Sequence, residues 1–89
     1  MKAILSVIGQ DKVGIIAQVS NLLAEKEINI LDVSQTIMEK EFVMMMSLSI
    51  PQNVDFQGLT NSFNQLGKDL GVEINLRNSK LYEAMHTLD

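Results

Sequence analysis

The spacing of hydrophobic and polar positions divides the first third of the chain into a strand and a helix. Residues 2–8, KAILSVI, are aliphatic and contain no helix breaker, which predicts a buried strand that stops at Gly9. From Val13 to Lys26 the hydrophobic positions take the spacing of a helix. Its apolar stripe consists of Ile15, Ile16, Val19, Leu22 and Leu23. Asp11 is predicted to cap this helix, because its carboxylate can accept hydrogen bonds from the first free N–H groups.

Two further strands follow, joined by a short polar turn. Residues 28–38, INILDVSQTIM, have strand character, and residues 38–41, MEKE, supply the turn. In residues 42–50, FVMMMSLSI, every second position is apolar on one face, which predicts a half-buried strand. Pro51 ends this strand, so residues 28–50 read as a hairpin.

The last part of the chain predicts a second helix and a fourth strand. The helix runs from about 55 to 70, with Asn53 or Asp55 as its N-cap and Gly71 as its C-terminal stop. Its hydrophobic face consists of Phe56, Leu59, Phe63, Leu66 and Leu70. Residues 72–77 alternate apolar and polar positions, as a half-exposed strand does.

The tail, residues 79–89, has the pattern of a short amphipathic helix. Ser79 is its candidate N-cap. Its apolar positions, spaced i, i+3, i+4 and i+7, are Leu81, Ala84, Met85 and Leu88.

The order β-α-β-β-α-β predicts a fold of the α+β class with the ferredoxin-like plan. We expect a four-stranded antiparallel sheet with two helices on one face, followed by the short C-terminal helix. The domain division is 1–78 for the sheet and its two helices and 79–89 for the helical tail.

Such a sheet leaves one face open, yet hydrophobic residues occur on both faces of its strands. The first strand carries Leu5 and Val7 on one face and Ile4 and Ile8 on the other. These residues are either ordinary core and edge positions of a small domain, or part of a dimer that buries the second face or extends the sheet edge.

Composition excludes several classes of function. Of the 89 residues 46% are hydrophobic, which is enough for a packed core. The chain has no cysteine, which excludes disulfides, thiol catalysis and cysteine-based metal centres and fits a reducing cytoplasm. The net charge of -4 and the scattered lysines argue against direct nucleic-acid binding. The apolar run at the start is too short for a membrane span, so we expect a cytoplasmic protein that does not enter a membrane.

Two features could carry chemistry, and each has a simpler explanation. Met38 and residues 44–46, all methionines, could ligate Cu(I), but methionine more often fills cores and adaptable interfaces. His86 is the only histidine, and with Glu83 it lacks a nucleophilic partner. We therefore expect that the protein is not an enzyme and that it binds neither a metal nor a cofactor.

The stretch GQDKVGII, residues 9–16, joins the first strand to the first helix. A glycine in the first turn of a helix leaves backbone N–H groups accessible, and the positive end of the helix favours a carboxylate. Alternatively, this stretch is only a capped structural turn.

This turn, the helix ending in LLAEKEINILDVSQ and the FVMMMSLSI strand together resemble the ACT domain family over residues 1 to about 78. Gly9, Asp11 and Gly14 match the family loop G-x-D/N-x-P-G, and residues 28–30, Ile-Asn-Ile, match the start of its second strand. Two departures are Val13 in place of the proline and Glu27 in place of a glycine. The tail sequence Glu-Ala-Met-His resembles the small stand-alone bacterial ACT-domain proteins (UPF0237 type) related to the glycine cleavage system transcriptional repressor.

The resemblance implies a regulatory module that binds a small molecule, an amino acid by family analogy, and acts as a homodimer. In the family two domains pair, often with their sheets side by side, and the ligand binds at the interface between the loop before the first helix and the start of the second strand. Carried over to this chain, the ligand-binding residues are Asp11, Lys12, Val13, Gly14, Ile15, Asn29, Ile30 and Leu31. The competing interpretation is a protein-interaction module without a small ligand, which docks a protein partner or a second copy.

Overall fold

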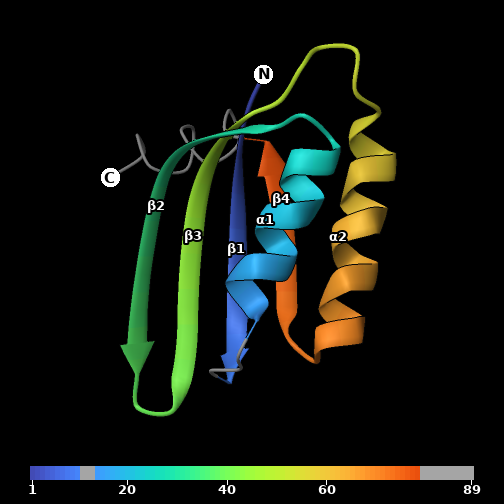
Figure 1. Ribbon diagram of the computed structural model, residues 1–89. Helices are drawn as coiled ribbons and strands as arrows, with labels where there is room; N and C mark the ends of the chain where they lie inside the picture. The colour runs from blue at the N-terminus through green and yellow to red at the C-terminus, as the bar shows by residue number, and fades with distance from the viewer. Residues whose placement is uncertain (11–13, 79–89) are drawn as a thin grey trace.

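The computed structural model describes residues 1–10 and 14–78 and has the predicted order of elements (Figure 1). The four strands are β1 (Lys2–Gln10), β2 (Asn29–Met38), β3 (Glu41–Ser49) and β4 (Glu73–Asn78), and the two helices are α1 (Ile15–Glu25) and α2 (Phe56–Leu70). The strands form one sheet in the order β2-β3-β1-β4, in which every neighbouring pair is antiparallel. The α+β ferredoxin-like prediction is therefore confirmed.

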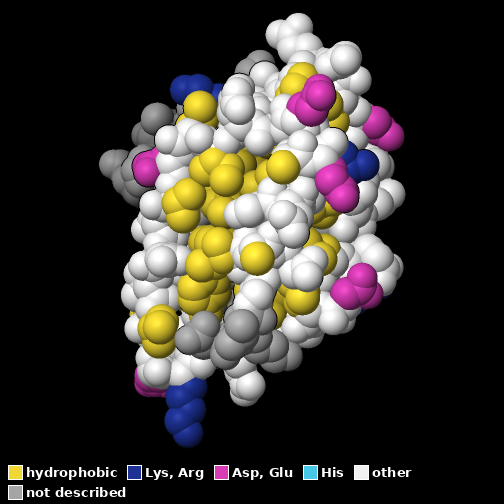
Figure 2. Space-filling view, viewed as in Figure 1, with side chains coloured by type: hydrophobic (Ala, Val, Ile, Leu, Met, Phe, Trp, Pro, Cys, Tyr) yellow, Lys and Arg dark blue, Asp and Glu magenta, His cyan; other side chains and the backbone are white. Residues whose placement is uncertain are grey.

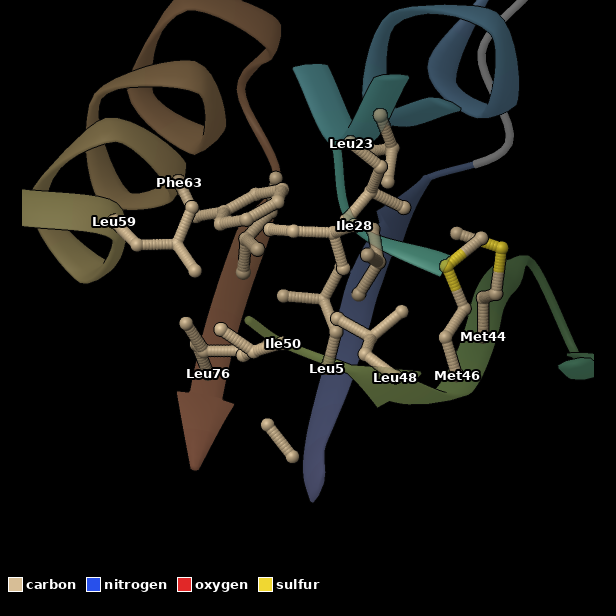
Figure 3. Packing of buried hydrophobic residues seen from close by; sticks show 14 of the residues in the cluster. Leu5, Leu23, Ile28, Met44, Met46, Leu48, Ile50, Leu59, Phe63 and Leu76 are labelled. Atoms are coloured by element: carbon tan, nitrogen blue, oxygen red, sulfur yellow. The ribbon is translucent and has the colours of Figure 1, made fainter. Parts of the chain in front are cut away.

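Both helices cover the same face of the sheet, which we call the helix face; the other is the open face (Figure 1). Alternate residues of the two central strands point into the helix face and are buried. Figure 3 shows Leu23 of α1 and Leu59 and Phe63 of α2 directed at these strand side chains. The core consists of Ala3, Leu5, Val7, Ile15, Val19, Leu23, Ile28, Phe42, Met44, Met46, Leu48, Ile50, Leu59, Phe63, Ile74 and Leu76.

Both helices end in the same way, with a residue in the left-handed conformation just after the last turn. At the end of α2, Gly71 has φ 72°, and the Val72 N–H donates to the Gly67 carbonyl at 2.9 Å. At the end of α1, Glu27 has φ 57°, and the Ile28 N–H donates to the Leu23 carbonyl at 2.9 Å. These are Schellman-type ends, which usually place glycine at this position. The glutamate that departs from the family pattern thus adopts a conformation that suits glycine.

Gly9 is required by a close approach of two segments. A Cβ atom at this position would lie 2.6 Å from Cγ1 of Val72, which follows α2. The glycine therefore lets the turn between α2 and β4 pack directly on β1.

The start of α1 differs from the prediction. The helix begins at Ile15 rather than Val13, and Gly14 occupies the N-cap position that the sequence assigned to Asp11. Gly14 has φ 93°, a conformation that side chains disfavour, and this explains the glycine. Asp11 itself, with Lys12 and Val13, lies outside the described residues, as does the predicted helix over 79–89. Asp55 is the N-cap residue of α2, as predicted, but its side chain makes no capping hydrogen bond.

Candidate functional site

β2 is an edge strand that neither helix covers. All ten of its residues are exposed, on both faces of the sheet. Its large hydrophobic side chains stay in contact with solvent, with Ile37 62% and Met38 63% exposed. Figure 2 shows hydrophobic side chains gathered on this side of the molecule, over β2 and toward α1. Edge strands of monomers usually carry lysine, proline or other protection, whereas β2 carries a single charged residue, Asp32. The strand has the character of an interface.

A hydrogen bond of the Asp32 side chain shows which backbone N–H groups of β2 point away from β3. Its Oδ1 accepts a hydrogen bond from the Val33 N–H at 2.9 Å, next to a bulge between Ile30 and Asp32. The Val33 N–H therefore does not point to β3, and by strand alternation the N–H groups of Gln35 and Ile37 face outward too. The second half of β2 thus presents backbone donors along the sheet edge.

The start of α1 lies near the far end of β2. Gly14 makes no side-chain cap, and none of the described atoms lies within 4 Å of where its Cβ would be. The first N–H groups of a helix have no acceptor within the helix. The side chain of Ile15 is 2% exposed and belongs to the core, so only its backbone is available to a ligand.

A groove of about 370 Å³ lies between the first turn of α1 and the second half of β2. We call it the edge groove, and its lining residues are Ile16, Gln35, Thr36, Ile37 and Phe42. It combines three hydrophobic side chains with one amide and one hydroxyl. The groove suits a small amphiphilic ligand or the hydrophobic side chains of a partner.

The structure separates the two halves of the predicted binding site. Asn29 pairs with Ser49, which pairs with Lys2 at the start of β1. Gly14, in contrast, follows the other end of β1, beyond Gln10. The length of β1 sets these ends about 26 Å apart at 3.3 Å per residue. Asn29, Ile30 and Leu31 are exposed, but within one chain they do not meet Gly14.

Sequence reasoning missed the edge groove. Its members come from α1, β2 and β3, and no local motif joins them. The available signal was the surplus of hydrophobic positions: Ile16 and Ile37 fit the periodicity of their elements but remain exposed. The register of β2, which the sequence did not supply, is what brings them together.

Other candidate chemistry finds little support. Met44 and Met46 point into the core, while Met45 lies on the open face, so these three thioethers do not converge. No group of three or more His, Cys, Asp or Glu side chains suited to a metal occurs in residues 1–10 and 14–78. A cavity of about 550 Å³ at the β2–β3 turn is lined by charges of both signs, including Glu39, Lys40 and Glu41. His86 and Glu83 lie outside the described residues. Within the described part of the chain, no helix has the length and hydrophobicity that crossing a membrane requires.

Comparison with known proteins gives the family. The ACT domain family model matches residues 2–77, and the chain belongs to this family. A UPF0237 protein of Listeria monocytogenes is 48% identical over 89 residues, covering 99% of this chain and 100% of the relative. The solved structure of an ACT domain protein from Streptococcus pneumoniae is 43% identical, with a TM-score of 0.84 over 93% of this chain and 94% of that one.

Two more distant structures share the fold. A glycine cleavage system transcriptional repressor is 22% identical with a TM-score of 0.78, over 86% of this chain and 47% of that chain. The regulatory subunit of aspartate kinase from Thermus thermophilus is 24% identical with a TM-score of 0.67, over 86% of this chain and 50% of that chain. The chain thus matches a small ACT domain protein along nearly its whole length, and it shares its fold with about half of each of two longer chains.

Proposed function

We propose that this protein is a non-catalytic regulatory module that binds an amino acid in the cytoplasm and acts as a homodimer. The observation that carries the proposal is the exposed hydrophobic edge strand beside the open start of α1. Membership of the ACT family supports a regulatory ligand-binding role, since these domains generally bind small molecules and form oligomers. The names of two structural neighbours, a regulatory subunit and a transcriptional repressor, point the same way.

The dimer forms when β2 of each copy pairs in antiparallel fashion, which joins two sheets into one. The outward N–H groups of β2 and its exposed hydrophobic side chains support this pairing. A two-fold axis through the middle of β2 sets the start of one strand beside the end of the other. Asn29 and Leu31 of one copy then approach Gly14 of the second copy, so the site is complete only in the dimer.

The chemistry of this shared site fits an amino acid. A ligand carboxylate binds at the N–H groups that follow Gly14, where the helix end is positive. The ammonium group donates to the side-chain oxygen of Asn29 from the second copy or to Asp11. The loop residues Asp11, Lys12 and Val13, the backbone of Ile15, and Ile30 and Leu31 of the second copy complete the contacts. The hydrophobic lining of the edge groove favours an apolar ligand side chain.

Regulation follows if the ligand binds one arrangement of the dimer, or one complex with a protein partner, more tightly than another. A ligand shifts such an equilibrium only by its difference in affinity between the two states. Because ligand and second copy share the β2 edge, an amino acid bound there changes the dimer interface directly.

The second candidate function is a protein-interaction module without a small ligand. The same exposed edge strand favours it, since β2 can add a strand from a protein partner. It differs in its response to amino acids: partner binding is then insensitive to them.

Thermal unfolding against each of the twenty amino acids at millimolar concentration tests the proposal, with light scattering on the same samples. A ligand at one hundred times its Kd stabilises the folded state by about 2.7 kcal/mol. For a domain of this size this raises Tm by roughly 10 to 20 °C. We expect one or a few amino acids to raise Tm. This rise should be lost in Gly14→Asp and largely kept in the uncharged variant Gly14→Asn. No rise with any amino acid favours the interaction module.

A further inference from the structure

The open face of the sheet is neither a second core nor an ordinary polar surface. Alternation along the two central strands places four hydrophobic residues on it, which are Ile4, Ile8, Val43 and Met45. Met45 is 39% exposed, and the other three are half-buried. Serines lie between them: Ser6 pairs with Met45, and Ser47 pairs with Ile4. The hydrophobic part of the face is therefore narrow.

A shallow hollow of about 220 Å³ lies in this face. Ile4 and Met45 form its hydrophobic side, and Asp32 and Ser34 of β2 with Ser47 form its polar side. Its volume corresponds to one or two aliphatic side chains. The hollow thus fits a narrow amphipathic element better than a flat surface.

The chain leaves the last strand of the sheet close to this face. β4 is antiparallel to β1 and stops at Asn78, which pairs with Ala3, close to the Ile4 end of the open face. Residues 79–89 follow and lie outside the described residues. As a helix they extend about 16 Å at 1.5 Å per residue. The sheet measures about 14 Å from β4 to β2 at 4.8 Å per strand. The tail is therefore long enough to cross from β4 over the hollow.

The tail matches the face in its hydrophobic pattern, and one of its charged residues has the sign opposite to the basic residues near the end of β4. Its apolar stripe is as narrow as the hydrophobic part of the face, with Met85 and Leu88 toward its far end. Lys2 and Arg77 lie on the open face near the end where β4 stops. Glu83, one helical turn after Ser79, has the opposite charge and the right position along the tail to meet them.

From this geometry we propose that residues 79–89 fold back as an amphipathic helix across the open face of their own sheet, with a hydrophobic side chain of the tail seated in the hollow. A second copy fits the same face poorly, because a stable interface buries about 800 Å² per partner and has a hydrophobic centre. Serines and charges interrupt this face. The tail closes the second face of the sheet within one chain and leaves the β2 edge as the exposed hydrophobic surface.

Paired cysteines test the position of the tail, because the chain has no cysteine of its own. Two double variants of the full chain carry Ser47→Cys, one with Leu88→Cys and the other with Met85→Cys. The control pair, Asn61→Cys with Leu88→Cys, places the first thiol on the exposed side of α2, across the sheet. Mild oxidation in dilute solution is followed by mass spectrometry and non-reducing electrophoresis.

We expect a disulfide within single chains, with loss of both free thiols, in at least one Ser47→Cys pair and not in the control pair. Disulfides between chains would show that the tail docks on a second copy. Free thiols in both Ser47→Cys pairs would show that the tail does not lie on this face. Either result overturns the proposal, whereas neither bears on amino-acid binding at the β2 edge.

Discussion

Replacing Ile37 with glutamine is the substitution that most directly perturbs the proposed β2 interface. Ile37 lies in the second half of β2, and its side chain is 62% exposed in the single chain. Ile37→Gln replaces a branched aliphatic side chain with an unbranched one that ends in a polar amide. Because most of the side chain is in water already, the fold of a single chain should lose only about 1 kcal/mol or less.

The cost to the dimer follows from the exposed fraction. Full burial of an isoleucine side chain contributes about 1.5–3 kcal/mol. The 62% that is exposed corresponds to about 1–2 kcal/mol for each copy. Both copies contribute Ile37 to a symmetric interface, so the dimer loses about 2–4 kcal/mol. The dimer dissociation constant should therefore rise roughly 30- to 700-fold.

Sedimentation equilibrium over a dilution series measures this change, and thermal unfolding of each variant checks the fold. Met45→Gln is the matched control, because Met45 is an exposed hydrophobic residue of the same sheet that lies on the open face, away from the β2 edge. It should leave the dissociation constant within about threefold of the original value. Equal dimerisation of the original chain and Ile37→Gln would refute the β2 interface.

Three further substitutions test single features of the structure. Glu27→Gly should raise the free energy of unfolding, measured by chemical denaturation, by about 1 kcal/mol, because glycine adopts the left-handed conformation without strain. The control Glu25→Gly, in the last turn of α1, should lower it by a similar amount. A lower free energy of unfolding in Glu27→Gly would contradict the strain at Glu27. Gly9→Ala should cost about 1–3 kcal/mol through its clash with Cγ1 and Cβ of Val72, and less in a Val72→Gly background, which removes both atoms. Equal costs in both backgrounds would exclude the contact. Asp32→Ala frees the outward N–H of Val33 and should stabilise the dimer by about 1 kcal/mol per copy, as measured by the same sedimentation assay. A less stable dimer would mean that the Asp32 carboxylate supports the interface.

The sequence predicted the elements with strong periodicity. The helical stripe through Val19 and Leu23 and the alternation of Met44, Met46 and Leu48 identify faces that the structure buries. Local propensity and tertiary burial agree at these positions, so pattern alone predicts them. Gly71 was correctly identified as the end of α2, because its left-handed conformation is a local requirement.

Tertiary features were harder to predict. The sequence assigned the cap of α1 to Asp11, whereas the helix begins later and Gly14 takes the cap position. The grouping of Gly14 with Asn29 in one site comes from family resemblance and stays a prediction, because within one chain the two residues lie at opposite ends of the sheet. The distance between two residues in the folded protein depends on strand direction and register, which the spacing of residues in the sequence does not encode.

A site shared between two copies is the central claim, and mixing two inactive variants tests it most directly. Gly14→Asp places a carboxylate at the cap, where Asp tolerates the left-handed conformation and repels a ligand carboxylate. Asn29→Ala removes the contact from the other end of the sheet. Each variant alone should fail to bind the amino acid that most raises Tm of the original chain. When the two variants are mixed in equal amounts, half of the dimers contain one copy of each. Each such dimer regains one of its two sites, so calorimetry should detect about a quarter of the original number of sites. No recovery in a mixture that exchanges subunits freely would contradict the shared site.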